Sequence, residues 1–331
     1  MRRKQTYLPL CIAATVTLMG LISCNNEETD SLAGGPVEAQ ISAGLSAPAT
    51  RAVDDKWNAD NIGVMVTDAS ASSMEALYRN VKYSTVSTGT TADFTAVGEG
   101  IFFHDADETV TFAAYAPYQT SANNATLPGT DGVIKVDTKE NNTEAKQESI
   151  DFLFASGAKA SKESPTVTFT ENSGSDGTDC SFHHKMTRLQ LVLQTSTVDG
   201  FSADDIFDAT AVKLGGLKHS GTFNVTTGAV TTDETETVVS DWDIIGCKKA
   251  DDTSTRTYTL ILLPQDVSSA LNFSVMIDGQ AYYNNTDITP KLKAGYSYTY
   301  TITVKRSGLA VSGCTIAEWG NGTSGSGDAK M

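Results

Sequence analysis

The chain has 331 residues and a formal net charge of −16, from 24 lysines and arginines against 40 aspartates and glutamates. So acidic a chain lacks the basic surface that nucleic acids require, and we expect no nucleic-acid partner. Short apolar stretches and polar turns recur without a long helical period, which predicts an all-β protein with room for two domains.

Residues 1–23 have the composition of a bacterial lipoprotein signal peptide. A basic start, Met1-Arg2-Arg3-Lys4, precedes a mainly apolar stretch that is too short for a comfortable membrane span. The sequence Leu21-Ile22-Ser23-Cys24 resembles a lipobox. It predicts that the Cys24 thiol carries a lipid anchor, which holds stably when two or three acyl chains are attached. A secreted protein with an accidental cysteine is the alternative.

Residues 24–36 form an acidic, small-residue tether after the lipidated cysteine. Such a polar composition is typical of a solvated linker. Acidic residues directly after a lipidated cysteine also resemble the signal that sends some lipoproteins to the outer face of the outer membrane. We therefore predict a location at the cell outer membrane and cell surface.

Residues 37–45 alternate strictly between apolar and polar or small side chains. This period of two predicts a half-buried β-strand. The side chains on its apolar face are Val37, Ala39, Ile41, Ala43 and Leu45.

Residues 37–51 are interpreted as a removable N-terminal strand with a cleavage site. Pro48 ends the strand, and Arg51 follows in a small-residue loop that a protease can reach. We predict that the strand fills a groove in the folded precursor and that a protease can cut it away between Arg51 and Ala52. An ordinary first strand with an incidental arginine is the alternative.

Residues 52–180 are predicted to form an N-terminal β-sandwich. Trp57 precedes a clear strand, 61–67, and is placed to pack against the end of the sheet. Many short alternating segments between polar turns favour a sandwich. The other expected strands lie within 78–97, 100–103, 109–115, 133–136, 151–155 and 166–170.

Several of these motifs resemble those of the bacterial fimbrillins, the subunit lipoproteins of type V pili. The carriers of the resemblance are Thr50-Arg51-Ala with Trp57 and Asn61-Ile-Gly-Val, the Ala-Tyr-Ala-Pro-Tyr118 ending, Asp151-Phe-Leu-Phe-Ala-Ser and Phe182-His-His-Lys-Met-Thr-Arg-Leu189. Their order behind a lipobox spans nearly the whole mature chain. The resemblance implies two tandem β-sandwiches of transthyretin-like topology and assembly with other fimbrial subunits.

Residues 181–320 are predicted to form a C-terminal β-sandwich, followed by a flexible Gly/Ser tail, 321–331. The clearest strand is 296–304, in which Tyr298, Tyr300, Ile302 and Val304 share one face. The nearly continuous apolar run 258–263 predicts an inner strand that Pro264 ends. Three cysteines remain in the mature domains, Cys180, Cys247 and Cys314, so at most one disulfide can form, and their spacing matches no zinc site.

No motif in the sequence supports an enzyme, a metal site or a cofactor. His183 and His184 are adjacent, so in a strand they point to opposite faces and cannot chelate one ion together. Asp105-Ala-Asp107-Glu108 lacks the glycine and distal glutamate of a calcium loop and is better explained as a hairpin turn. We therefore predict no catalytic residue, no metal and no cofactor.

The sequence favours a fimbrillin-like pilus subunit that serves adhesion to host or bacterial surface ligands. The resemblance implies export as a lipoprotein, release of the first strand by an arginine-specific surface protease and donor-strand exchange between subunits. The alternative is a membrane-anchored surface lipoprotein that binds glycans or host ligands without polymerising. The sequence leaves open whether the chain is a shaft, tip or anchor subunit.

Overall fold

The computed structural model describes residues 35–45, 56–58, 60–69, 73–106, 108–174, 177–284 and 287–319. All the strands belong to one unit, Pro36–Met331, and residues Met1–Gly35 form the other. The predicted signal peptide, Cys24, the processing site at Arg51 and Ala52, and the tail 321–331 lie outside the described residues. Within the described part of the chain, no helix is long and apolar enough to cross a membrane.

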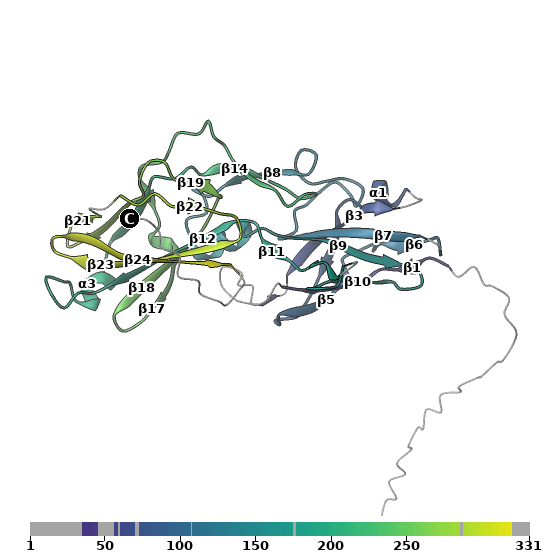
Figure 1. The fold of residues 1–331 in the computed structure, drawn as a ribbon, viewed down its shortest axis with the longest axis horizontal. Coiled ribbons are helices and arrows are strands. Elements are labelled where there is room, and N and C mark those ends of the chain that lie inside the picture. Colours follow the sequence, from purple (N-terminus) through teal and green to yellow (C-terminus); the bar gives the residue numbers. More distant parts are fainter. Residues whose placement is uncertain are drawn as a thin grey trace, which may run out of the picture. The chain divides into compact units, whose positions relative to one another are not determined.

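The regular secondary structure of the described residues is mostly β-strand, with only short helical pieces, which confirms the predicted all-β class (Figure 1). The strands of the N-terminal half are β1 (Val37–Glu38), β2 (Gln40–Gly44), β3 (Asn61–Ala69), β4 (Val81–Ser84), β5 (Thr91–Ala96), β6 (Phe102–Phe103), β7 (Thr109–Ala116), β8 (Val133–Asp137), β9 (Leu153–Ser161) and β10 (Thr166–Phe169).

The C-terminal half begins near β11 and has two longer strands at its centre. Its strands are β11 (His183–His184), β12 (Thr187–Gln194), β13 (Ala211–Gly215), β14 (Ser220–Asn224), β15 (Val230–Thr232), β16 (Trp242–Asp243), β17 (Lys248–Asp251), β18 (Thr255–Leu262), β19 (Gln265–Asp266), β20 (Asn272–Ile277), β21 (Gln280–Tyr283), β22 (Lys291–Leu292), β23 (Tyr296–Lys305) and β24 (Gly308–Glu318). The helical pieces are short: α1 (Met74–Leu77), α2 (Glu144–Gln147), α3 (Ala203–Phe207), and the 3-10 turns η1 (Glu148–Ile150) and η3 (Ile245–Cys247).

An eight-stranded sheet organises the N-terminal half, in the order β10-β2-β5-β4-β3-β7-β9-β11. Its inward side chains form one apolar core, because alternate residues of each strand point to the same face. Trp57 is fully buried in this core, as its place before the strand predicts. Strands β3, β7 and β9 pair antiparallel in its middle.

A sandwich of two sheets organises the C-terminal half. A five-stranded sheet, β17-β18-β12-β23-β24, and a four-stranded sheet, β16-β13-β20-β21, share a second core. The predicted face of 296–304 is confirmed, since Tyr298, Tyr300, Ile302 and Val304 are all buried there. The apolar run 258–263 is also buried, as predicted for an inner strand.

Strand β8 joins the two halves through its backbone. It pairs antiparallel with β14, and residues from both halves form a third core that includes Tyr115, Phe152, Phe223 and Ile261. Figure 1 shows β8 and β14 side by side. Backbone pairing therefore crosses the predicted boundary at residues 180 and 181, and the division into two domains stays a prediction.

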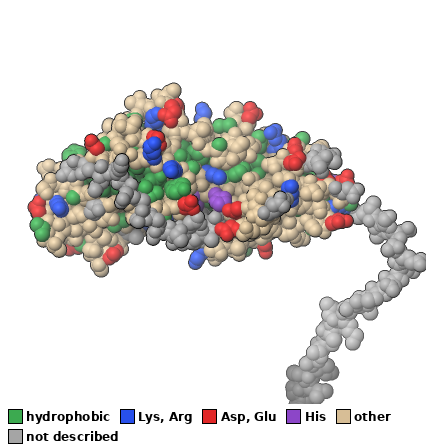
Figure 2. Space-filling model, in the orientation of Figure 1, with side chains coloured by type: hydrophobic (Ala, Val, Ile, Leu, Met, Phe, Trp, Pro, Cys, Tyr) green, Lys and Arg blue, Asp and Glu red, His purple; other side chains and the backbone are tan. Residues whose placement is uncertain are grey.

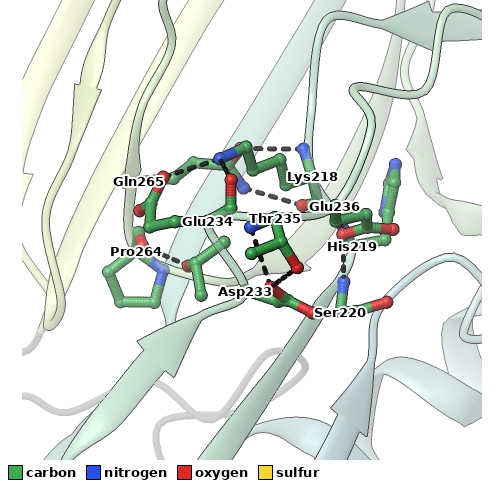
Figure 3. A network of polar contacts seen from close by, with 10 residues as sticks. Lys218, His219, Ser220, Asp233, Glu234, Thr235, Glu236, Pro264 and Gln265 are labelled. Carbon is green, nitrogen blue, oxygen red and sulfur yellow. Dashed lines mark hydrogen bonds and ion pairs between the residues drawn. The ribbon is translucent and has the colours of Figure 1, made fainter.

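A polar network stabilises the hairpin of β14 and β15, in which β15 pairs with the edge of β14 that faces away from β8 (Figure 3). The Glu236 carboxylate accepts hydrogen bonds from the backbone N–H groups of His219 and Ser220, each at 2.6 Å. The Gln265 side chain accepts from the Lys218 N–H and donates to the Lys218 carbonyl, each at 2.9 Å. These side chains satisfy the backbone, so the network has a structural role.

Candidate functional site

The predicted removable strand lies inside the eight-stranded sheet. Four residues of β2, from Ile41 to Gly44, pair antiparallel with β5, and β2 pairs in parallel with β10 along its other edge. The pairing continues past the strand, where Leu45 bridges to Phe182. Before β2, β1 pairs with β6 instead, so the predicted continuous strand is two short strands with different partners.

The apolar face of this segment points into the first core. Ala39 is 3 % exposed, Ile41 2 %, Ala43 0 % and Leu45 8 %. Val37 is only half-buried, because it lies at the start of the segment in β1. The alternate side chains of Glu38 and Gln40 are exposed, as the period of two predicts. The groove-filling role of these residues stays a proposal, developed below.

Strand β2 connects β10 to the rest of the sheet by backbone pairing. Among the described strands, β10 pairs with β2 alone. The Gln40 N–H donates to the Pro165 carbonyl, and the Phe182 N–H donates to the Gly44 carbonyl. Removal of β2 would therefore leave two strand edges, β5 and β10, facing a gap lined by apolar side chains.

Aromatic side chains line the floor of this gap. Phe169 of β10 contacts Phe182, Phe182 contacts Trp57, and Trp57 contacts Phe94 of β5, each with edge-to-face geometry at ring-centroid distances of 5.8, 5.2 and 5.1 Å. Such pairs add to the free energy of burial. The four rings thus connect the two strands that flank β2.

The histidines and cysteines show no arrangement for catalysis. His183 is exposed beside Asp179, whereas His184 is buried, with Nδ1 2.7 Å from an Asp151 oxygen and its ring stacked on Trp319 at 3.8 Å. The three cysteines in the described residues are free thiols, and burial raises the pKa of Cys247 to about 12. No cluster of metal-ligating side chains occurs among the residues that the structure describes.

Sequence reasoning did not find the structural polar residues that join the two halves. Gln147 of α2 accepts from the backbone N–H of Ile261, and Thr138 Oγ1 lies 2.8 Å from His219 Nδ1. A buried glutamine on a short helix gives no pattern from which such a distant partner can be predicted.

On the face that Figure 2 shows, acidic and basic side chains of the described residues are interspersed.

The sheets and their buried cores define an all-β protein of the sandwich class. The chain belongs to the fimbrillin-like family, whose model matches residues 50–319. The resemblance that the sequence motifs indicate is thereby confirmed.

The relatives of the chain agree with this family. A Bacteroides uniformis protein assigned as fimbrium subunit Fim1C is 30 % identical over 342 positions, which cover 99 % of this chain and 100 % of the relative. A crystal structure of a protein assigned to cell adhesion from Bacteroides ovatus is 27 % identical, with a TM-score of 0.67, over 86 % of this chain and 99 % of that one. A second, from Bacteroides uniformis, is also 27 % identical, with a TM-score of 0.63, over 86 % of this chain and 100 % of that one.

Proposed function

We propose that the chain is a fimbrial subunit whose own first strand occupies the place of a strand from another subunit until assembly. The observation that carries the proposal is the position of β2, which lies between two strand edges with four buried apolar side chains in the segment 39–45. Membership of the fimbrillin-like family supports a structural and adhesive role rather than an enzymatic one.

The two ladders of β2 fix the direction of any replacement strand. It must run parallel to β10 and antiparallel to β5 to make the same backbone hydrogen bonds. A strand donated in this way is β-augmentation. Because the donor and the groove are different surfaces, the contact is head-to-tail and does not close, so repetition builds a filament.

The segments on either side of the strand suggest how it is released. Cys24 carries the lipid in the proposed precursor and holds it in the outer membrane, and the tether 24–36 spaces the fold from the bilayer. An arginine-specific protease then cuts between Arg51 and Ala52. After the cut the strand is held by noncovalent contacts alone.

The energy of these contacts is compatible with exchange. Ile41 and Leu45 are each worth ~1.5–3 kcal/mol when fully buried, or about 3–6 kcal/mol together, and the two alanines add less. A domain has a net stability of about 5–15 kcal/mol, so losing the strand is severe but an equivalent donor can restore it. Without a donor, the open edges of β5 and β10 invite aggregation.

The test is the composition of surface filaments made by cells that carry the wild-type chain or the Arg51→Ala variant. We expect filaments to contain this chain with Ala52 at its N-terminus, and we expect the variant to be absent from them. Filaments that contain the chain with Cys24 still attached would overturn the proposal. A protein that is never found in polymers but stays anchored would favour the alternative of a ligand-binding surface lipoprotein.

A further inference from the structure

We propose that the groove beneath β2 selects its partner strand by side-chain size. It accepts a strand with small residues at the register positions of Ala39 and Ala43 and a branched aliphatic residue at the position of Ile41 between them. This inference rests on the proposed function, since it describes which strands can replace β2.

The position of Ala43 is the narrowest part of the groove. Ala43 is 0 % exposed, and its lateral neighbours in the two ladders are Phe169 on β10 and Ala92 on β5. Directly paired residues in a sheet point to the same face, with Cβ atoms about 5 Å apart. The Phe169 ring is itself fully buried, so it has no free space to move into.

The aromatic rings around this position support each other. Phe169 contacts Phe182, which contacts Trp57, and Trp57 in turn contacts Phe94, the lateral neighbour of Ile41. Protein interiors are packed as densely as organic crystals, so displacement of one ring in such a chain disturbs the next. A side chain larger than a methyl group at the Ala43 position must therefore push a ring out of its place.

The position of Ala39 follows the same pattern of a small residue beside a large one. The Ala39 N–H donates to the carbonyl of Ile101 at 2.8 Å, and the Ile101 side chain is fully buried. Ile41, by contrast, lies between Val167 on β10 and Phe94 on β5. The space between these two residues accommodates the four-carbon side chain of Ile41, which is 2 % exposed. The groove is thus wide in the middle and narrow at the positions two residues before and after.

On the opposite face of β2, the positions of Gln40 and Ser42 place no such limit on a partner, whereas a Cβ atom at the buried Gly44 would lie 3.1 Å from Thr170 Cγ2. Gln40 and Ser42 border an open surface hollow of about 520 Å³ together with Asp93, Thr95 and Thr166. A larger side chain at Ser42 can extend into this hollow. The groove therefore selects the inward residues of a donor strand and does not select the outward residues at the positions of Gln40 and Ser42.

Peptide exchange on the cut protein tests this size selection. The chain from residue 25 is given a site-specific protease sequence after Arg51, cut, and incubated with labelled peptides that span residues 36–46. We expect the native peptide to enter, the Ala43→Leu peptide to bind at least about tenfold more weakly, and the matched Ser42→Leu peptide to bind within about twofold of the native one.

A compensating variant separates size from other effects. In the Phe169→Val protein, where the ring beside Ala43 is smaller, we expect the Ala43→Leu peptide to bind better than the native peptide. Should this protein fail to fold, thermal unfolding of the uncut chain gives the second measurement, with Ala43→Leu expected to lower the midpoint and Ser42→Leu to leave it unchanged. Failure of the native peptide to enter would overturn the proposed function itself. Entry of the native and Ala43→Leu peptides with equal affinity would overturn the size selection alone.

Discussion

Strands β2 and β12 have the same kinds of neighbour in their sheets but differ in the extent of their contacts. Each lies between an antiparallel neighbour and a parallel one: β5 and β10 for β2, and β18 and β23 for β12. However, β12 pairs over eight residues with β18, from Thr187 to Gln194, whereas β2 pairs over four residues with β5.

The inward side chains of the two strands differ in the same sense. The buried apolar residues of β12 are three leucines, Leu189, Leu191 and Leu193, whereas the inward residues from Ala39 to Ala43 include a single large one, Ile41. Because buried area and ladder length both scale with the free energy of holding a strand, β12 is a permanent part of its core. Its counterpart β2 has fewer such contacts, as the proposed exchange of this strand requires, and it precedes the proposed cleavage site in the sequence.

The largest expected effect is on the permanent strand. Leu191→Asp should prevent folding of the C-terminal half, because it places a carboxylate in a core where the lost leucine alone costs about 2–5 kcal/mol. The measurement is the far-ultraviolet circular dichroism of the chain from residue 25, with Gln190→Asp on the outer face as the control. If the Leu191→Asp variant unfolded cooperatively and with wild-type stability, β12 would not be the more firmly held of the two strands.

Strand β2 should show a smaller loss of stability, measured in the uncut chain. Ile41→Asp should lower the stability of the uncut chain by about 3 kcal/mol or more, because a carboxylate enters the first core. The matched change Ser42→Asp should shift it by less than about 0.5 kcal/mol, since Ser42 faces the hollow. Chemical denaturation measures both, and equal small effects would mean that the segment is only a linker.

The stability of the fold is expected to depend on pH through His219, which lies where β8 pairs with β14. Burial lowers the pKa of His219 to about 4, against 6.5 for an ordinary histidine, while nearby Glu236 and Asp137 oppose the shift. The unfolded chain therefore binds a proton near pH 6.5 that the folded chain binds only near pH 4. His219 stabilises the fold above pH 6.5, and about 3 kcal/mol of this is lost as the pH falls to 4.

The control for this effect is His219→Gln, which can still reach Thr138 but does not titrate. Denaturant unfolding at pH 7 and at pH 4.5 should show a smaller loss of stability in this variant than in the wild type. An identical loss in both proteins would mean that other groups cause the acid sensitivity.

The smallest effect on stability is expected at the processing site. Arg51→Ala should leave the unfolding midpoint of the uncut chain within about 1 °C if Arg51 lies in the accessible loop that the sequence predicts, because a surface change away from packed contacts rarely exceeds about 0.5 kcal/mol. The same change should abolish cleavage by an arginine-specific protease at this position, measured by intact mass. Cleavage between positions 51 and 52 in the variant would show that the arginine is not what the protease recognises.

Local patterns in the sequence predicted the strands better than their partners. The alternation of 37–45 and of 296–304 identifies the buried apolar side chains correctly apart from Val37, because period-two burial is set within one strand, and it misses the burial of Ser297. The family motifs then indicated the fold class. Neither signal says which strands pair, since a ladder joins residues that are far apart in sequence.

The contacts that join the two halves were the main omission. The pairing of β8 with β14 brings Val136 beside Gly221. The local sequence of 133–137 looks the same as that of a strand that pairs within its own half, so it does not indicate this partner. The parallel pairing of β2 with β10 was also beyond the sequence, although it decides the direction of a donor strand. Both depend on tertiary packing, which overrides local preference.

Exchange of the cleaved strand measures the central claim most directly. The chain from residue 25, cut at the engineered site after Arg51, is incubated with an excess of isotope-labelled peptide 36–46 and followed by native mass spectrometry. We predict that the label replaces the original strand in the cut protein and does not enter the uncut protein. A cut protein that keeps its original strand, or loses it without taking up the label, would contradict strand exchange as the function of this site.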